Sequence, residues 1–348
     1  SGTSGGTASP AAIASSGGSP VSAATEEFTA GGIGDTIKNE GQVYYNSTAG
    51  TMNVTAIVYG TGAWASGGAM NTTRARVATA QSGTQNSAQV AGGQGTSVNT
   101  EQYNGSAWTE VANLNIAKQL QGGAGTQTSA ISASGYTNTW VTQTESWDGS
   151  SWSEVAETNL GRVQMGSAGV SGTSAMIYGG EGVPNSTLTA NTEIWNGSGW
   201  TEVNNLNTVR TQIAGGGTVT DAVGTGGGVD GSGTPTANTE TWDGTSWTEV
   251  ANLNTARNAA GVAASSSTSA LAFGGTSYPG NVSKNETEQW NGTAWTELAN
   301  LATARYDGNG NGTTSLALYS GGGTSASGST TTEEWTVPET VTNQVMTD

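Results

Sequence analysis

Six of the nine basic residues in this 348-residue chain recur at one regular spacing, and glutamates recur at two others. The bases are Arg74, Lys118, Arg162, Arg210, Arg257 and Arg305. The glutamates form a first row, Glu26, Glu101, Glu145, Glu193, Glu240, Glu288 and Glu333, and a second row, Glu110, Glu154, Glu202, Glu249 and Glu297. Such rows could line a charged channel for an ion or an anionic ligand. We expect instead that each base pairs with a glutamate of its own or the adjacent repeat, because strictly periodic residues usually serve the contacts between repeats.

The residue types that catalysis most often uses are scarce in this chain. The chain has no Cys and no His, so a thiolate metal site and a Cys nucleophile are excluded, and acid–base work would fall to carboxylates. A glycosidase needs two unlike carboxylates roughly 5–10 Å apart. Nearly half of the acids belong to the repeated rows, and no pair outside them is conspicuous. The sequence therefore predicts no catalytic residues, no cofactor and no enzymatic activity.

One short run could bind calcium. Asp307, Asn309 and Asn311 alternate with glycines, as at the start of a calcium loop. The twelfth position of that loop would be Leu318 rather than Glu, and one charged ligand is few. We therefore predict no metal, and we expect a Gly-rich strand or turn here, with these three residues as the only calcium candidate.

A repeated block positions these charges. The block TEQYNGSAWTEVANLN, which begins at Thr100, returns four more times with small changes. Its second Trp falls at spacings of 44–48 residues, at Trp108, Trp152, Trp200, Trp247 and Trp295. A period of this length with alternating aromatic and polar residues is typical of a β-propeller. The sequence therefore predicts an all-β fold, even though glycine accounts for 55 residues.

Each repeat has the pattern of four strands. In the best copy the runs NAAGVAAS, SALAFGG, TEQW and AWTEL read as successive strands, and a Gly pair follows the second. Asn291-Gly292 separates the last two strands and predicts a type I′ hairpin turn, in which both central residues have positive φ. Antiparallel four-stranded units of this kind are typical of a kelch-type propeller blade.

The ends of the chain leave the number of blades open. The second-strand motif occurs seven times, beginning at Ala11, whereas the fourth-strand Trp occurs six times, beginning at Trp64. Either seven blades form and the last lacks or borrows its outer strand, or the Trp64 strand completes the last of six blades. We favour seven, because the six-bladed closure leaves an orphan piece at residues 1–30 that would be unstable alone. We expect one propeller over residues 1–337 with a β-hairpin insert at about 31–60, followed by a tail at 338–348.

The charge balance limits the partners. The chain carries 26 acids and 9 bases, for a net charge of −17. A nucleic-acid-binding protein is expected to present a basic face, and an anionic membrane surface attracts basic segments. No apolar run approaches the length of a membrane span. We therefore expect neither nucleic-acid binding nor membrane insertion.

Departures from the repeat are where a binding site could enter, because loops carry binding residues in many scaffolds. The loops after the Gly pair vary most. Trp140 is the only Trp outside the repeat positions, and it follows Tyr136 in a segment rich in Asn and Thr. An exposed aromatic among polar residues suits a sugar-binding surface. We predict a binding surface at Trp140, Tyr136 and Tyr278, with local packing of Trp140 under its own loop as the alternative.

The wording of the repeat also resembles a known group. The runs SALAFGG, TEQWNGTAWTELANL and EGQVYYNSTAGTM are similar to kelch-like propeller proteins of marine tailed phages and uncultured marine viruses. The resemblance covers nearly the whole chain. It implies a virion surface component, such as a fibre, appendage or decoration module, which contacts other virion proteins, copies of itself or host surface glycans. The alternative is a secreted or cell-surface adhesion propeller of a marine microbe that binds glycans, and a propeller hydrolase is the third hypothesis.

Overall fold

The structure is a computed structural model that describes residues 43–46, 49–79, 82–182, 187–277, 282–324 and 327–345. The chain divides into two compact units, one of Ser1–Val58 with Glu339–Asp348 and one of Tyr59–Pro338. No helix in the described ranges is long and apolar enough to span a membrane.

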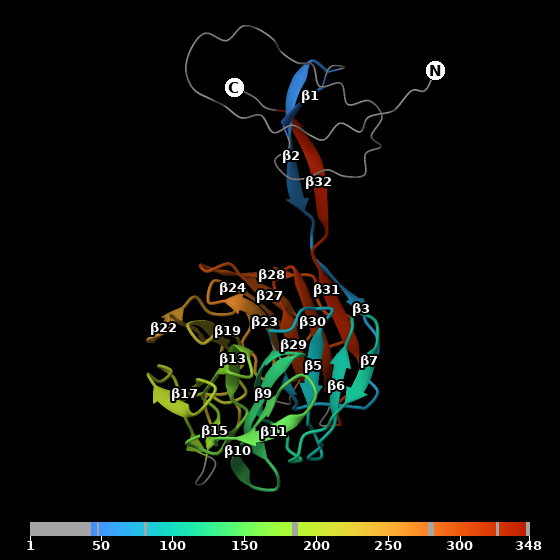
Figure 1. The fold of residues 1–348 in the computed structure, drawn as a ribbon. Helices are drawn as coiled ribbons and strands as arrows, with labels where there is room; N and C mark the ends of the chain where they lie inside the picture. The colour runs from blue at the N-terminus through green and yellow to red at the C-terminus, as the bar shows by residue number, and fades with distance from the viewer. Residues whose placement is uncertain are drawn as a thin grey trace, which may run out of the picture. The chain divides into compact units, whose positions relative to one another are not determined.

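The unit Tyr59–Pro338 is built from six four-stranded antiparallel sheets, which follow one another in chain order (Figure 1). We call them blades one to six. Blade one consists of β4 (Ala78–Thr79), β5 (Ala88–Ala91), β6 (Thr100–Tyr103) and β7 (Trp108–Val111). Blade two consists of β8 (Gly122–Thr126), β9 (Ser129–Tyr136), β10 (Trp140–Trp147) and β11 (Trp152–Val155). Blade three consists of β13 (Gly166–Ser171), β14 (Ser174–Tyr178), β17 (Thr192–Trp195) and β18 (Trp200–Val203). Blade four consists of β19 (Ala214–Thr218), β20 (Asp221–Thr225), β21 (Thr239–Trp242) and β22 (Trp247–Val250). Blade five consists of β23 (Gly261–Ser266), β24 (Ser269–Phe273), β27 (Thr287–Trp290) and β28 (Trp295–Leu298). Blade six consists of β29 (Tyr306–Gly312), β30 (Leu316–Gly323), β31 (Thr332–Thr336) and β3 (Ala63–Ser66). The prediction of an all-β propeller is confirmed.

The outer strand of blade six comes from the other end of the chain. Strand β3 pairs with β31, and Trp64 lies opposite Trp335. The inner strands β8, β13, β19, β23, β29 and β4 contact one another in this order, and β4 also contacts β8. Among the described residues Trp64 fills the outer-strand position that the last repeat lacks, as the six-bladed alternative has it, while the number of blades stays a prediction. The strand motifs at Ala11 and Glu26 lie outside the described residues.

A ring of backbone hydrogen bonds runs through all six blades. In each blade the residue two positions after the periodic base has φ between 52° and 61°. These residues are Arg76, Leu120, Gln164, Gln212, Ala259 and Asp307. Each N–H donates to the carbonyl of its counterpart in the preceding blade at 2.7–3.1 Å, and the Arg76 N–H donates to Asp307 and completes the circle. Non-glycine residues seldom adopt this left-handed conformation, so the six residues hold it through the closure of the ring.

Two rows of aromatic residues form the blade cores. The inner row is at most 2% exposed and consists of Trp147, Trp195, Trp242, Trp290 and Trp335. The outer row is the repeated Trp of the sequence, which is 5–8% exposed. Trp247 Nε1 donates to Thr192 Oγ1 of the preceding blade at 3.1 Å, and the outer Trp residues of blades one, two, five and six make the same contact. Trp200 Nε1 is the exception, since it is buried without a partner. The Trp repeat therefore joins neighbouring blades as well as filling them.

The turn after the third strand differs from the predicted type I′ turn. Four residues separate the paired Trp290 and Trp295, and of these Gly292 alone has positive φ. Asn291 Oδ1 accepts the N–H groups of Thr293 and Ala294, both at 2.9 Å. The Asn/Asp therefore acts through its side-chain oxygen, as in an Asx turn, rather than through a positive φ of its own.

The hairpin insert and the tail form one small sheet. Strands β1 (Val43–Asn46), β2 (Thr51–Tyr59) and β32 (Glu339–Val345) pair in the order β1-β2-β32. The hydroxyls of Thr340 and Thr342 donate to the β2 carbonyls of Val58 and Ala56. Two segments that the sequence treats separately are thus joined by strand pairing. Further short strands, β12 (Arg162–Val163) with β15 (Glu181–Gly182) and β16 (Thr187–Leu188), and β25 (Thr276–Ser277) with β26 (Val282–Ser283), lie in the loops of blades three and five.

Candidate functional site

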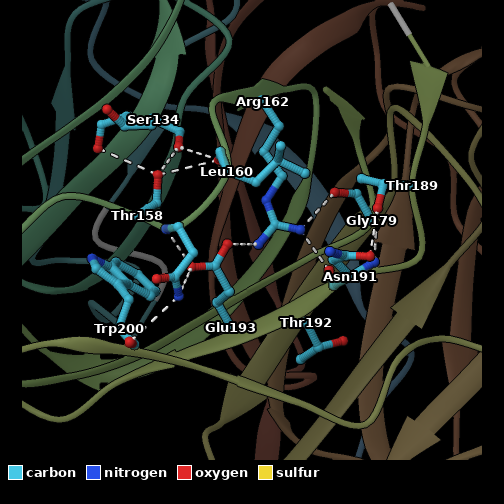
Figure 2. A network of polar contacts seen from close by, with 12 residues as sticks. Ser134, Thr158, Leu160, Arg162, Gly179, Thr189, Asn191, Thr192, Glu193 and Trp200 are labelled. Atoms are coloured by element: carbon cyan, nitrogen blue, oxygen red, sulfur yellow. Dashed lines mark hydrogen bonds and ion pairs between the residues drawn. The ribbon is translucent and has the colours of Figure 1, made fainter. Parts of the chain in front are cut away.

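The periodic base of each blade is buried beside a glutamate of the same blade, as Figure 2 shows for Arg162. Its Nη2 lies 2.7 Å from Glu193 Oε1 on β17. Its Nη1 donates to the carbonyls of Asn191, at 2.6 Å, and Gly179, at 3.3 Å. Glu193 Oε2 in turn accepts the backbone and side-chain N–H groups of Asn159 at 2.8 and 2.9 Å. All the contacts of these two charged groups are therefore made within the protein, and neither group faces a ligand site.

The same ion pair occurs in all six blades. The pairs are Arg74–Glu101, Lys118–Glu145, Arg162–Glu193, Arg210–Glu240, Arg257–Glu288 and Arg305–Glu333. In every pair both side chains are at most 3% exposed. A ligand-binding channel would need charges that face an opening, so this geometry supports the structural role of the rows.

Burial also affects how these bases hold their protons. Burial lowers the pKa of the Arg162 guanidinium, and the charge of Glu193 opposes that shift. The effect is large at Lys118, where burial lowers the pKa from 10.5 to about 8 despite Glu145. Lys118 Nζ lies 3.8 Å from Glu145 Oε1 and donates to the carbonyls of Ser132 and Gln143. An ammonium at this position makes a looser pair than the guanidinium groups of most other blades.

The second row of glutamates lies on the outer strands and faces solvent. Glu202 on β18 is exposed and lies directly opposite Glu193 on β17. Charged side chains on an edge strand discourage pairing with other strand edges. This row therefore contributes solubility to the outer edges of the blades.

The hydrogen-bonded ring brings one further ion pair to the propeller axis. Arg76 Nε lies 3.1 Å from Asp307 Oδ2 across the junction of blades one and six, and the side chains are 29% and 11% exposed. Burial raises the pKa of the Asp307 carboxyl, while Arg76 lowers it. Arg76 stands outside the sequence rows, and the signal that could have found it is its place two residues after a periodic base.

The calcium candidate does not have the geometry of a metal loop. Asp307, Asn309 and Asn311 lie along strand β29, and the Asp307 carboxylate holds Arg76. Asn309 and Asn311 are buried, and the Asn309 amide donates to the Asn311 side-chain oxygen. A strand cannot wrap its ligands around one ion as a calcium loop does. In the described ranges no three acidic residues gather as a metal site.

The predicted aromatic surface is only partly present. Trp140 begins β10, is half-buried, and lies edge-to-face against Tyr136 with ring centroids 6.1 Å apart. Its Nε1 is buried without a hydrogen-bond partner. Trp140 and Tyr136 therefore pack against each other, as the alternative of local packing has it, and part of the Trp140 side chain is also exposed. Tyr278 lies outside the described residues.

The comparisons with known proteins identify the fold. No family model matches the chain, and no curated protein matches it. Two hundred chains of solved structures match, among them the structure of YjhT. That match has a TM-score of 0.65 at 13% sequence identity, and covers 79% of this chain and 99% of YjhT. At this identity the likeness shows the β-propeller fold and transfers no site.

The match also corrects one sequence prediction. The chain was expected not to be an enzyme because its sequence shows no catalytic constellation. The β-propeller fold that the chain shares with YjhT hosts enzymes as well as binding proteins, so the prediction that the chain is not an enzyme does not stand. A hydrolysis screen on polysaccharides is the direct test. Spacing along one sequence does not show which residues of separate blades come together, so it was too weak a basis for that prediction.

Proposed function

We propose that this chain is a surface attachment module, in which the three-stranded sheet binds a carrier and the propeller provides the surface for further contacts. The observation that carries the proposal is the exposed apolar face of this sheet. Val43, Met52 and Val58 are 49%, 45% and 41% exposed. Val43 lies opposite Val54, and Met52, Val54 and Val58 are an even number of positions apart on β2, so these apolar side chains share one face.

Exposure of these apolar side chains to water is unfavourable, and a partner that covers the face would remove this cost. A sheet this small buries little apolar surface of its own, so covering its apolar face would stabilise it. Contiguous exposed apolar residues on a soluble protein mark interaction sites. Asn53 and Thr55, on the opposite face of β2, are 4% and 3% exposed. Their polar side chains are therefore buried, whereas the apolar side chains of the other face are exposed.

The carrier we propose is a virus particle, and the partners are other virion proteins. The resemblance of the repeat and of the run EGQVYYNSTAGTM to propellers of marine tailed phages supports this choice. The net charge of −17 favours an apolar rather than an electrostatic attachment, because a virion surface of like sign would repel the chain. Host glycans are the ligands we propose for the surface near Tyr136 and Trp140.

Co-purification with virus particles tests the attachment. We expect a fixed copy number per particle, and we expect loss of attachment in the double variant Met52→Asp and Val58→Asp. The control Val209→Asp changes an equally exposed valine of the propeller, at 44% exposure. Absence of the protein from particles, or equal attachment of both variants, would contradict the proposal.

Trp140→Ala tests the glycan contact separately. We expect weaker binding of glycans or host cells by this variant with unchanged attachment to particles. Val209→Ala is the control, because it shortens an exposed side chain of the propeller outside this surface. Unchanged glycan and cell binding by Trp140→Ala would exclude this surface.

A further inference from the structure

A cavity of about 250 Å³ lies where the turns between the first and second strands of the blades meet around the axis. Five blades contribute to its lining. The lining includes Ser82 of blade one, Val170 of blade three, Thr218 of blade four, Ser265 of blade five, and Thr313 and Leu316 of blade six. All of them belong to the propeller unit, so the site is independent of the attachment proposed above.

Two lining residues depart from the repeat in the same direction. Val170 is the extra residue of a bulge in blade three, and the matching extra residue of blade five is Ser265, as the strand registers show. Val170 is 47% exposed. An aliphatic side chain that folding leaves exposed at a cavity, where the sister blade has a hydroxyl, points to a ligand.

Leu316 shows the same departure in blade six. Its counterparts in blades three, four and five are Ser174, Asp221 and Ser269, each of which precedes the alanine opposite the inner Trp. Leu316 is 43% exposed. The two aliphatic substitutions come from different blades and meet at one cavity.

The third departure is the long connection in blade one. Residues 80–87 join β4 to β5, whereas Val219 and Thr220 alone join β19 to β20. The Ser82 N–H donates to the carbonyl of Gly125 in blade two at 3.0 Å, and its Oγ donates to that of Gly169 in blade three at 2.6 Å. The segment thus reaches across blade two to blade three and forms part of the cavity wall.

The chemistry of the lining selects the ligand. The lining residues include no acid and no base, so a charged ligand would lose hydration without gaining a counter-charge. Hydroxyls of Thr218, Ser265 and Thr313 lie beside the aliphatic Val170 and Leu316. The volume falls just under the range of roughly 300–1,000 Å³ that holds drug-sized ligands, so it suits one ring. We propose that this cavity binds one uncharged sugar ring that carries an aliphatic substituent, such as a 6-deoxyhexose.

Three sugars that differ only at carbon 6 test the proposal on the intact chain. D-fucose carries a methyl group there, D-galactose a hydroxymethyl group and D-galacturonic acid a carboxylate. Titration followed by calorimetry and by NMR is expected to rank them in this order, with D-galacturonic acid not binding. Failure of D-fucose to bind at millimolar concentration, or a preference for D-galacturonic acid, would overturn the assignment.

Variants that restore the repeat locate the site. Val170→Ser and Leu316→Ser place residues that sister blades already carry, so both should fold. We expect each to weaken D-fucose binding by about ten-fold, since one lost aliphatic contact in a pocket is worth roughly that much. Val209→Thr, which changes an exposed valine outside the cavity, should bind as the parent does. Equal binding by all three variants would place the sugar elsewhere and refute the proposal.

Discussion

Removing one glutamate of the buried row should destabilise the propeller far more than removing its exposed neighbour. Glu193 and Glu202 lie opposite each other on adjacent strands of blade three. Glu193 is buried and holds Arg162, whereas Glu202 faces solvent. Glu193→Ala and Glu202→Ala therefore remove the same side chain from two environments in one sheet, which makes the second variant a matched control.

The size of the effect follows from what Glu193→Ala leaves behind. The Arg162 guanidinium stays fully buried, and its Nε already has no partner. Two N–H groups of Asn159 also lose their acceptor. Breaking a buried pair by removing one partner costs about 3–5 kcal/mol. Removing an exposed charge costs about 0–1 kcal/mol, so we expect a difference of about 3 kcal/mol or more.

Urea unfolding followed by Trp fluorescence measures the difference, because the inner Trp of blade three, Trp195, lies on the same strand as Glu193. Glu193→Gln separates charge from hydrogen bonding, since the amide can keep an acceptor for Asn159. We expect it to lie between the parent and Glu193→Ala in unfolding midpoint. Equal midpoints for Glu193→Ala and Glu202→Ala would refute the structural role of the buried pair.

Three further predictions concern the base of blade two, the closure and the inner strands. Because folding lowers the pKa of Lys118 from 10.5 to about 8, the unfolded chain binds more protons between these values. The unfolding free energy should therefore rise with pH across this window, by at most about 3 kcal/mol, relative to a Lys118→Arg variant measured in parallel; parallel pH profiles would exclude it. Trp64→Ala should cost about 3 kcal/mol in chemical unfolding, because this ring packs in blade six and closes the propeller; an effect below 0.5 kcal/mol would contradict the closure. Gly310→Ala would place a Cβ 2.2 Å from the Val262 carbonyl oxygen and should lower the thermal midpoint, while Gly199→Ala, with nothing within 4 Å, should not; equal midpoints would mean that β23 and β29 are not so close.

Local pattern determined the blade. The strand runs, the Gly pair, both Trp positions and the ion-pair rows repeat every 44–48 residues, because each blade makes the same contacts with its neighbours. That each base pairs with a glutamate was predicted from the spacing, whereas the structure decided that Arg162 pairs with Glu193 of its own blade. The turn at Asn291-Gly292 was placed correctly, although its conformation differs from the predicted type I′ turn because the Asn side chain supplies the hydrogen bonds.

The closure and the cavity were decided by tertiary structure. The outer strand of blade six joins Trp64 to Trp335 from opposite ends of the chain, and a periodic sequence contains no signal for how many repeats complete a circle. The left-handed conformation of Arg76 depends on the carbonyl of Asp307, which reaches it only when the ring closes. Val170 and Leu316 lie near strand ends of different blades, and only the assembled propeller brings them to one cavity. The sequence by itself determined the blade and the contacts within it. The packing of the blades against one another, which depends on the whole fold, decided which residues meet at the axis.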